Sequence, residues 1–182
     1  MQSYYQMTVL EKWTEDLYKR MHLNQPSQIN ISYISDRLNI WVHYLDVRSK
    51  CIEASAGMYS MFIDNRLPSS LQRLEFLHEL CHLLRHAGED TLMPERFTSS
   101  QEDESERFIL YAAMPYSMIS RMPLPELREE AIQQVAAEFQ VPVELALQRI
   151  DQIQRRILQG QLLAVMGRAE SKTTHKRQLL RE

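Results

Sequence analysis

The stretch His78-Glu79-Leu80-Cys81-His82 constrains this chain more than any other, because it is an H-E-x-x-H box. On an α-helix, its two histidines lie about one turn apart on the same face, where both imidazoles can bind one metal ion. Glu79 lies beside them and can accept a proton from a water that the ion activates. The box therefore predicts a helix that carries part of a metal site.

The flanking residues favour this helix. Leucines recur at spacings of three and four residues, at Leu71, Leu74, Leu77, Leu80 and Leu84. Ser69 or Ser70, after Pro68, is a suitable N-cap, and Gly88 is a suitable residue to end the helix. The alternative is a surface helix that carries two histidines without a metal.

Bulk properties are those of an ordinary soluble, helix-rich protein. The chain has 182 residues, enough for one compact domain or a small domain with a helical appendage, and only four glycines. A net charge of -3 gives no overall attraction to nucleic acid or to an anionic membrane. The two cysteines do not suggest a disulfide framework, and we see neither a signal peptide nor a membrane-spanning stretch. We therefore expect a cytoplasmic protein.

Hydrophobic periodicity predicts the order of the elements. Helices are expected at about 5–22 and 31–39, strands at 40–45, 51–54 and 58–63, and then the helix with the H-E-x-x-H box. A loop at 89–100, a helix at 102–113 and a helical pair at 127–139 and 143–157 follow, before a polar, frayed tail from Gly160. The fold class is α+β, helix-rich, with a small three-stranded sheet before the metal helix and a C-terminal helical pair. We expect boundaries at 1–121, 122–158 and 159–182.

The acidic run after the predicted loop offers the third ligand that a catalytic zinc needs. Glu102 is the favoured donor, and Glu106, one turn on, would orient a zinc-bound imidazole. Glu104 is the weaker alternative, because it lies about 200° around the helix from Glu102. His86, one turn beyond His82, is expected to line the site rather than to ligate. The alternative is a solvated acidic run that the helix dipole favours.

Three separated motifs resemble the ImmA/IrrE metallopeptidases. They are the string from Leu74 to His86 with Arg73 before it, then Glu102-x-x-Ser105-x-x-Phe108 with Met114-Pro115, and lastly 136–150. The resemblance covers about residues 28–155. The chain departs from the family pattern at Cys81, Ser105 and Glu106, none of which removes a ligand. We expect Cys81 to be a core residue that lies near the metal.

The resemblance implies a zincin-like fold and a zinc-dependent endopeptidase that cleaves a helix-turn-helix repressor and so releases gene expression. Carried over residue by residue, it places Zn²⁺ on His78, His82 and Glu102 and makes Glu79 the general base. It implies a protein substrate. From the net charge and the lack of a membrane-spanning stretch, we expect no specific nucleic acid and no membrane as partner.

Other roles stay open in the sequence. His86, Tyr111 and His43 are candidates to bind substrate or stabilise the oxyanion, while Arg73 and Arg85 could bind the substrate backbone or pair with the acidic helix. Two rival functions remain. One is a DNA-binding regulator built on the C-terminal helical pair, whose second helix offers three arginines, Arg149, Arg155 and Arg156. The other is a zinc-dependent module that binds a repressor without cleaving it.

Overall fold

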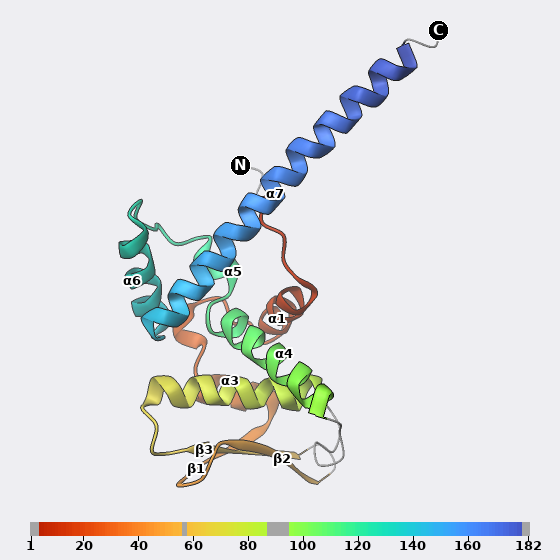
Figure 1. Cartoon of the computed structure of the whole chain (residues 1–182). Helices are drawn as coiled ribbons and strands as arrows, with labels where there is room; N and C mark the ends of the chain where they lie inside the picture. The colour runs from red at the N-terminus through yellow and green to blue at the C-terminus, as the bar shows by residue number, and fades with distance from the viewer. Residues whose placement is uncertain (1–3, 56–57, 87–94, 180–182) are drawn as a thin grey trace.

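The computed structural model describes residues 4–55, 58–86 and 95–179. A small sheet forms one end of the molecule, and the helix with the H-E-x-x-H box lies across it (Figure 1). Further helices pack on the other side of that helix, and a long C-terminal helix crosses them and runs out beyond the body (Figure 1). The α+β, helix-rich class and the small sheet before the metal helix are both confirmed.

The N-terminal helices are set by side-chain caps. Helix α1 spans Val9–Arg20, and Thr8 accepts a hydrogen bond from the Glu11 amide at its start. It is shorter than the predicted 5–22, because residues 4–7 precede the Thr8 cap without helical structure. After the short 3-10 helix η1 (Pro26–Gln28), helix α2 spans Ile31–Leu38. Asn30 caps α2, and Asn39 ends it in the left-handed conformation that asparagine tolerates.

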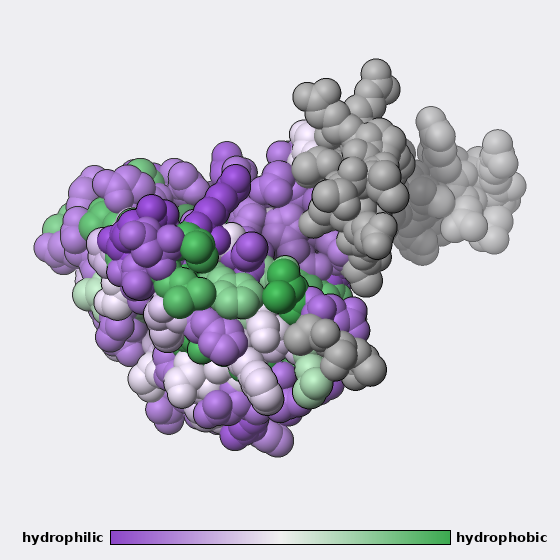
Figure 2. All heavy atoms as spheres, turned by 90° about the horizontal axis from the view of Figure 1, so that it is seen from below, coloured by the Kyte–Doolittle hydropathy of each residue, from purple (hydrophilic) through white to green (hydrophobic). Residues whose placement is uncertain are grey.

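The three predicted strands form one sheet. Strands β1 (Ile40–Leu45), β2 (Lys50–Ser55) and β3 (Met58–Asp64) are ordered β1-β3-β2, with β3 parallel to β1 and antiparallel to β2. Side chains alternate between the two faces, so Met61 and Ile63 are buried in the core while Trp41 is 60% exposed. Figure 2 looks onto this end of the molecule and shows a band of apolar side chains across a mostly hydrophilic face. Strand β2 lies at an edge of the sheet.

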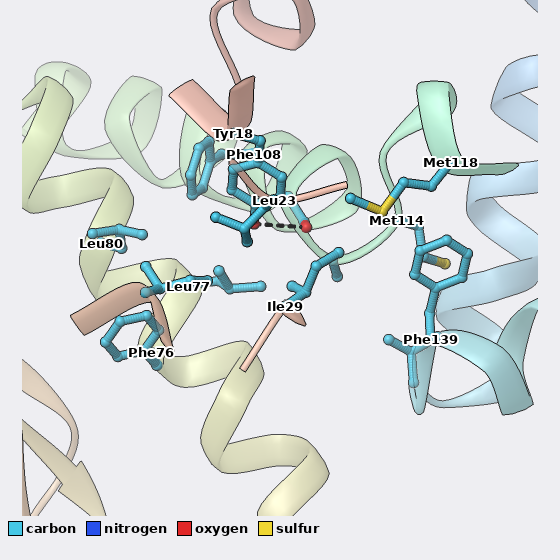
Figure 3. Close-up of a cluster of buried hydrophobic side chains, with 14 of the residues drawn as sticks. Tyr18, Leu23, Ile29, Phe76, Leu77, Leu80, Phe108, Met114, Met118 and Phe139 are labelled. Carbon is cyan, nitrogen blue, oxygen red and sulfur yellow. Dashed lines mark hydrogen bonds between the residues drawn. The ribbon is translucent and has the colours of Figure 1, made fainter. Parts of the chain in front are cut away.

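Helix α3 (Ser69–Arg85) sits between the sheet and the other helices. Its buried face includes Phe76, Leu77 and Leu80, which lie in one cluster with residues of the N-terminal and C-terminal helices (Figure 3). The Tyr18 hydroxyl donates to the Ala112 carbonyl at 2.8 Å, the dashed line of Figure 3, and so joins α1 to α4 (Glu95–Ala113) inside this core.

The ends of α3 and α4 differ from the prediction. Pro68 is the N-cap of α3, so Ser69 and Ser70 are its first helical residues rather than caps. His86 is its C-cap, and Gly88 lies outside the described residues. Helix α4 already begins at Glu95, so the predicted loop at 89–100 is wrong for its second part, and the rest of it lies outside the described residues.

The C-terminal helices are α5 (Tyr116–Ile119), α6 (Arg128–Phe139) and α7 (Val143–Leu179). The helical pair is confirmed, but the predicted end of its second helix near Leu158 is wrong, because α7 continues as one helix of 37 residues. The apolar periodicity of the sequence beyond Leu158 is weak, so it does not predict this continuation of the helix. The expected domain boundaries stay predictions. One buried cluster joins residues of α3, α6 and α7.

Candidate metal centre

His78 and His82 come together on α3 as the helical spacing predicts. Their Nε2 atoms lie 3.0 Å apart, and both rings are partly exposed at the same cleft. Helical periodicity accounts for this pairing, because the two residues are four positions apart on a regular helix held by the buried Phe76, Leu77 and Leu80. The two imidazoles present one nitrogen each to a common point.

Glu102 reaches the same point from α4. Its Oε2 lies 3.4 Å from His78 Nε2, and its Oε1 lies 3.4 Å from His82 Nε2. Around a tetrahedral zinc with bonds of about 2.0–2.2 Å, ligand atoms lie roughly 3.3–3.6 Å apart. Two imidazole nitrogens and one carboxylate oxygen are also a donor set that zinc accepts. Both Glu102 distances lie in this range, and the 3.0 Å between the two imidazole nitrogens is slightly shorter. The three residues form a candidate metal cluster in the described part of the chain, and three ligands to a tetrahedral zinc would leave one position open.

Glu79 lies in the same cleft, held by the sheet. Its Oε2 accepts a hydrogen bond from the Cys51 amide of β2 at 3.0 Å. The pKa of the Glu79 carboxyl is raised to about 7, chiefly by burial and also by the Glu75 and Glu102 carboxylates, while the hydrogen bond from Cys51 lowers it. A carboxyl with a pKa near neutrality suits general acid–base chemistry.

The cleft has a volume of about 510 Å³. Strand β2 and the residues before it form one wall, and α3 with Glu102 forms the other. Its lining adds side chains that sequence reasoning missed: Arg48, Lys50 and Tyr59. Strand alternation could have pointed to Tyr59, because it lies two residues before Met61 and four before Ile63 on β3 and so shares their sheet face. Nothing in the local sequence marks Arg48.

His86 lies behind His82 rather than over the cluster. Its Nδ1 is 3.2 Å from His82 Nδ1, the ring nitrogen opposite the one that meets His78 and Glu102. Its Nε2 is 3.4 Å from Glu104 Oε2. This placement agrees with the expectation that His86 does not bind the metal. It also does not favour the other role considered for His86, stabilisation of the oxyanion. Glu104 is also bound by Arg85, so the ion pair proposed for Arg85 is present.

Glu106 does not have the place that the sequence suggested. It is exposed, and it forms no hydrogen bond or ion pair with another described residue. The reason is helical phase. The buried stripe of α4 includes Ser105, Phe108 and Ala112, and at about 100° per residue Glu106 points further from that stripe than Glu102 does. Glu104, on the other flank of the stripe, makes the contact with a histidine instead.

Tyr111 and His43 are not brought to the site. Tyr111 is buried in α4, where its hydroxyl accepts hydrogen bonds from Arg156 and Gln152 of α7. His43 lies on β1, which β3 separates from β2, and it stacks on Phe62 with ring centroids 5.3 Å apart. Neither residue lines the cleft, because the sequence does not tell which side of α4 faces it or which strand lies beside it.

Arg73 and Cys81 serve the core. The Arg73 guanidinium donates to the carbonyls of Ile29, Phe139 and Gln140, so it ties α3 to the end of α6, and it does not line the cleft. Cys81 is fully buried, and burial raises the pKa of its thiol to about 11. A protonated, buried thiol behaves as a small apolar side chain, as expected from the sequence.

The fold and this cluster define a class: a helix-rich α+β protein of zincin-like architecture with a His-His-Glu group on two packed helices. The family model described as the IrrE N-terminal-like domain, Peptidase_M78, matches residues 35–151, and the chain belongs to this family. The resemblance to the ImmA/IrrE metallopeptidases is thereby confirmed.

Two relatives come from Bacillus subtilis (strain 168). The "Phage-like element PBSX protein XkdA" is 35% identical over 147 residues, which cover 81% of this chain and 74% of that protein. The "Uncharacterized protein YqaB" is 33% identical over 150 residues, which cover 82% of this chain and 87% of that protein. Both matches span the metal site.

One solved structure shares the fold. A "Mycobacterium tuberculosis transcriptional regulator" superposes with a TM-score of 0.51 at 15% identity, over 75% of this chain. This chain spans only 44% of that protein, and at such identity the likeness concerns the fold alone. Among the helices of the described residues, none has the length and apolar character required to cross a bilayer.

Proposed function

We propose that this protein is a zinc-dependent endopeptidase. The observation that carries the proposal is the convergence of His78, His82 and Glu102 within 4.8 Å of one another, with the Glu79 carboxyl in the same cleft. Membership of a peptidase family supports it. In this proposal the three residues hold the ion, and Glu79 is the general base.

Each residue has a separate part in hydrolysis. His78, His82 and Glu102 would hold the zinc ion, which would supply Lewis-acid polarisation of the scissile carbonyl and of water. Glu79 accepts the proton of the attacking water and donates it to the leaving amine. The Cys51 amide holds the Glu79 carboxylate in place. For the oxyanion we propose Tyr59, since its side chain lines the cleft whereas those of Tyr111 and His43 do not.

The cleft suits a peptide in extended conformation. Strand β2 pairs with β3 on one side, and no other strand of the described residues pairs with its second edge. Cys51 directs its amide away from β3 toward Glu79, so this edge faces the proposed general base. An extended chain can add to such an edge through backbone hydrogen bonds, largely independent of its sequence. This favours a protein substrate over a small molecule.

We further propose that the substrate is a helix-turn-helix repressor. The ImmA/IrrE resemblance supplies this expectation, and the relative named as a phage-like element protein supports a setting in a mobile element. Repressors in such elements keep genes silent until they are removed, so cleavage would release expression.

The alternative function, a regulator that binds DNA through the C-terminal helical pair, has little support from the arginines that the sequence offered for it. Arg149 is completely buried, and it forms an ion pair with Glu11. Arg156 binds the same carboxylate. Two of the three arginines that the sequence offered between residues 143 and 157 therefore neutralise a charge inside the protein rather than face a phosphate backbone. The other alternative, a zinc-dependent module that binds a repressor without cleaving it, would not need the buried Glu79 carboxyl as a general base.

Cleavage of a candidate repressor tests the proposal. The purified, zinc-loaded protein is incubated with a candidate helix-turn-helix repressor from its own genome, and products are followed by mass spectrometry. We expect one defined cut, which is lost in Glu79→Gln. Zinc binding without cleavage of that repressor or of an unfolded casein would instead favour the binding module.

A further inference from the structure

The geometry points to a hydrogen-bonded relay, Glu104–His86–His82, that fixes the tautomer of His82 so that its Nε2 lone pair faces the metal position. The inference rests on the proposed metal site and deepens it. Glu104 and His86 act here as positioning residues, because neither lies at the His78, His82 and Glu102 cluster itself.

The contacts run in line behind His82. Its Nδ1 lies 3.2 Å from His86 Nδ1, and His86 Nε2 lies 3.4 Å from Glu104 Oε2. The two imidazole rings meet edge to face, with centroids 5.1 Å apart. The His86 side chain is only 7% exposed, so water competes little for its nitrogens. The relay therefore joins the ligand on α3 to α4 through two neighbouring polar contacts.

The Glu104 carboxylate determines which ring nitrogens of His86 and His82 donate hydrogen bonds and which accept them. An ionised carboxylate only accepts hydrogen bonds, so His86 Nε2 must donate to Glu104. In a neutral imidazole the other nitrogen is then an acceptor, so His86 Nδ1 accepts from His82 Nδ1. With its proton on Nδ1, His82 has its lone pair on Nε2, the atom that lies beside His78 and Glu102.

Glu104 is itself anchored. Its Oε1 is bound by the Arg85 guanidinium, which also lies 5.0 Å from the Trp13 ring centroid. The arginine uses one carboxylate oxygen and leaves Oε2 for His86. By contrast, no hydrogen bond to His78 Nδ1 is found in the described part of the chain. The relay thus acts on one of the two histidine ligands, and His78 serves as an internal reference.

Tautomer and metal affinity are measured separately. Nitrogen-15 NMR of the zinc-free protein reports which ring nitrogen of His82 carries the proton, and competition with a chromogenic chelator gives the zinc Kd. The variants are Glu104→Gln, His86→Leu and His86→Asn, with Glu106→Gln on the same helix as the matched control. Circular dichroism confirms that each variant is folded.

Each variant has a distinct expected result. The Glu104→Gln amide can donate to His86, which allows the reverse relay and shifts His82 toward the Nε2-protonated form. His86→Leu removes the acceptor and should weaken zinc binding roughly 10–100-fold. His86→Asn keeps an acceptor near the Nδ1 position and should retain most of the affinity. Glu106→Gln should change neither the tautomer nor the Kd.

An unchanged His82 tautomer in both Glu104→Gln and His86→Leu overturns the relay. So does a zinc Kd within about twofold of wild type in His86→Leu, since loss of such a partner costs 10-fold or more. If the unaltered protein binds no zinc, the proposed function fails, but the tautomer measurement on the zinc-free protein still decides the relay.

Discussion

Glu11 of α1 and Arg149 of α7 form an ion pair with essentially no exposure of either side chain. Arg149 also donates to the Met114 carbonyl, and Tyr5 donates to Glu11 Oε1 at 2.6 Å. Arg156 adds a second cation at the same carboxylate. This network joins the N-terminal segment, α1, the residue after α4, and α7. A single acid therefore connects parts of the chain that are distant in sequence.

Breaking this pair on one side should destabilise the protein strongly. Arg149→Met leaves the Glu11 carboxylate buried with fewer partners, and we expect the free energy of unfolding to fall by about 3–5 kcal/mol. The double variant Glu11→Leu/Arg149→Met should lose less than the sum of the single variants. Urea unfolding of the four proteins measures the coupling, and strict additivity would contradict it.

Gly160 marks a close crossing of α7 with the N-terminal segment. A Cβ at this position would lie 2.0 Å from the Tyr4 carbonyl oxygen, a backbone atom that cannot move aside by itself. Gly160→Ala should therefore destabilise by about 1–3 kcal/mol in spite of the better helix propensity of alanine. Gln161→Ala, at an exposed neighbouring position, is the matched control. Equal midpoints of thermal unfolding for both variants would show that the segment is not packed there.

Zinc should bind one to one and stabilise the folded chain. Ligand binding to the native state adds about 4 kcal/mol when the free ligand exceeds its Kd about 1,000-fold, so the unfolding midpoint should rise with added zinc and fall with a chelator. Glu102→Ala should keep the fold and lose most of this response. A full zinc response in Glu102→Ala would mean that another residue is the third ligand.

Glu79→Gln should separate metal binding from catalysis. The amide cannot accept the proton of the attacking water, so cleavage should fall by about 10²–10⁴-fold while zinc content stays near one ion per chain. Metal analysis and cleavage are measured on the same preparation. Cleavage that persists in the zinc-loaded variant would exclude Glu79 as the general base.

The isolated protein should bind duplex DNA only weakly at physiological salt. Its net charge is -3, and Arg149 and Arg156 are bound to Glu11. A DNA-binding module would instead show tight binding that falls steeply with salt, as counterions are released. Fluorescence anisotropy at two salt concentrations tests this. Sequence-specific, salt-sensitive binding would favour the regulator over the peptidase.

The sequence predicted well wherever the determining interactions are local. His78, Glu79 and His82 are placed by helical periodicity, which needs only the hydrogen bonds of one helix and a buried face. The strands at 40–45 and 58–63 are also predicted by a local pattern, the alternation of side chains between the two faces of a strand. These patterns hold over a few residues, so they can be recognised without knowledge of the rest of the chain.

Tertiary packing decided which neighbours the local elements meet. The acidic run on α4 offers several carboxylates, and only the crossing of α4 with α3 brings Glu102 to the histidines, Glu104 to His86 and Glu106 to solvent. The same packing buries Tyr111 and pairs Arg149 with Glu11. The physical reason is that helical phase sets which residues share a face, but the rotation and crossing of one helix on another depend on side-chain packing contributed by the whole core.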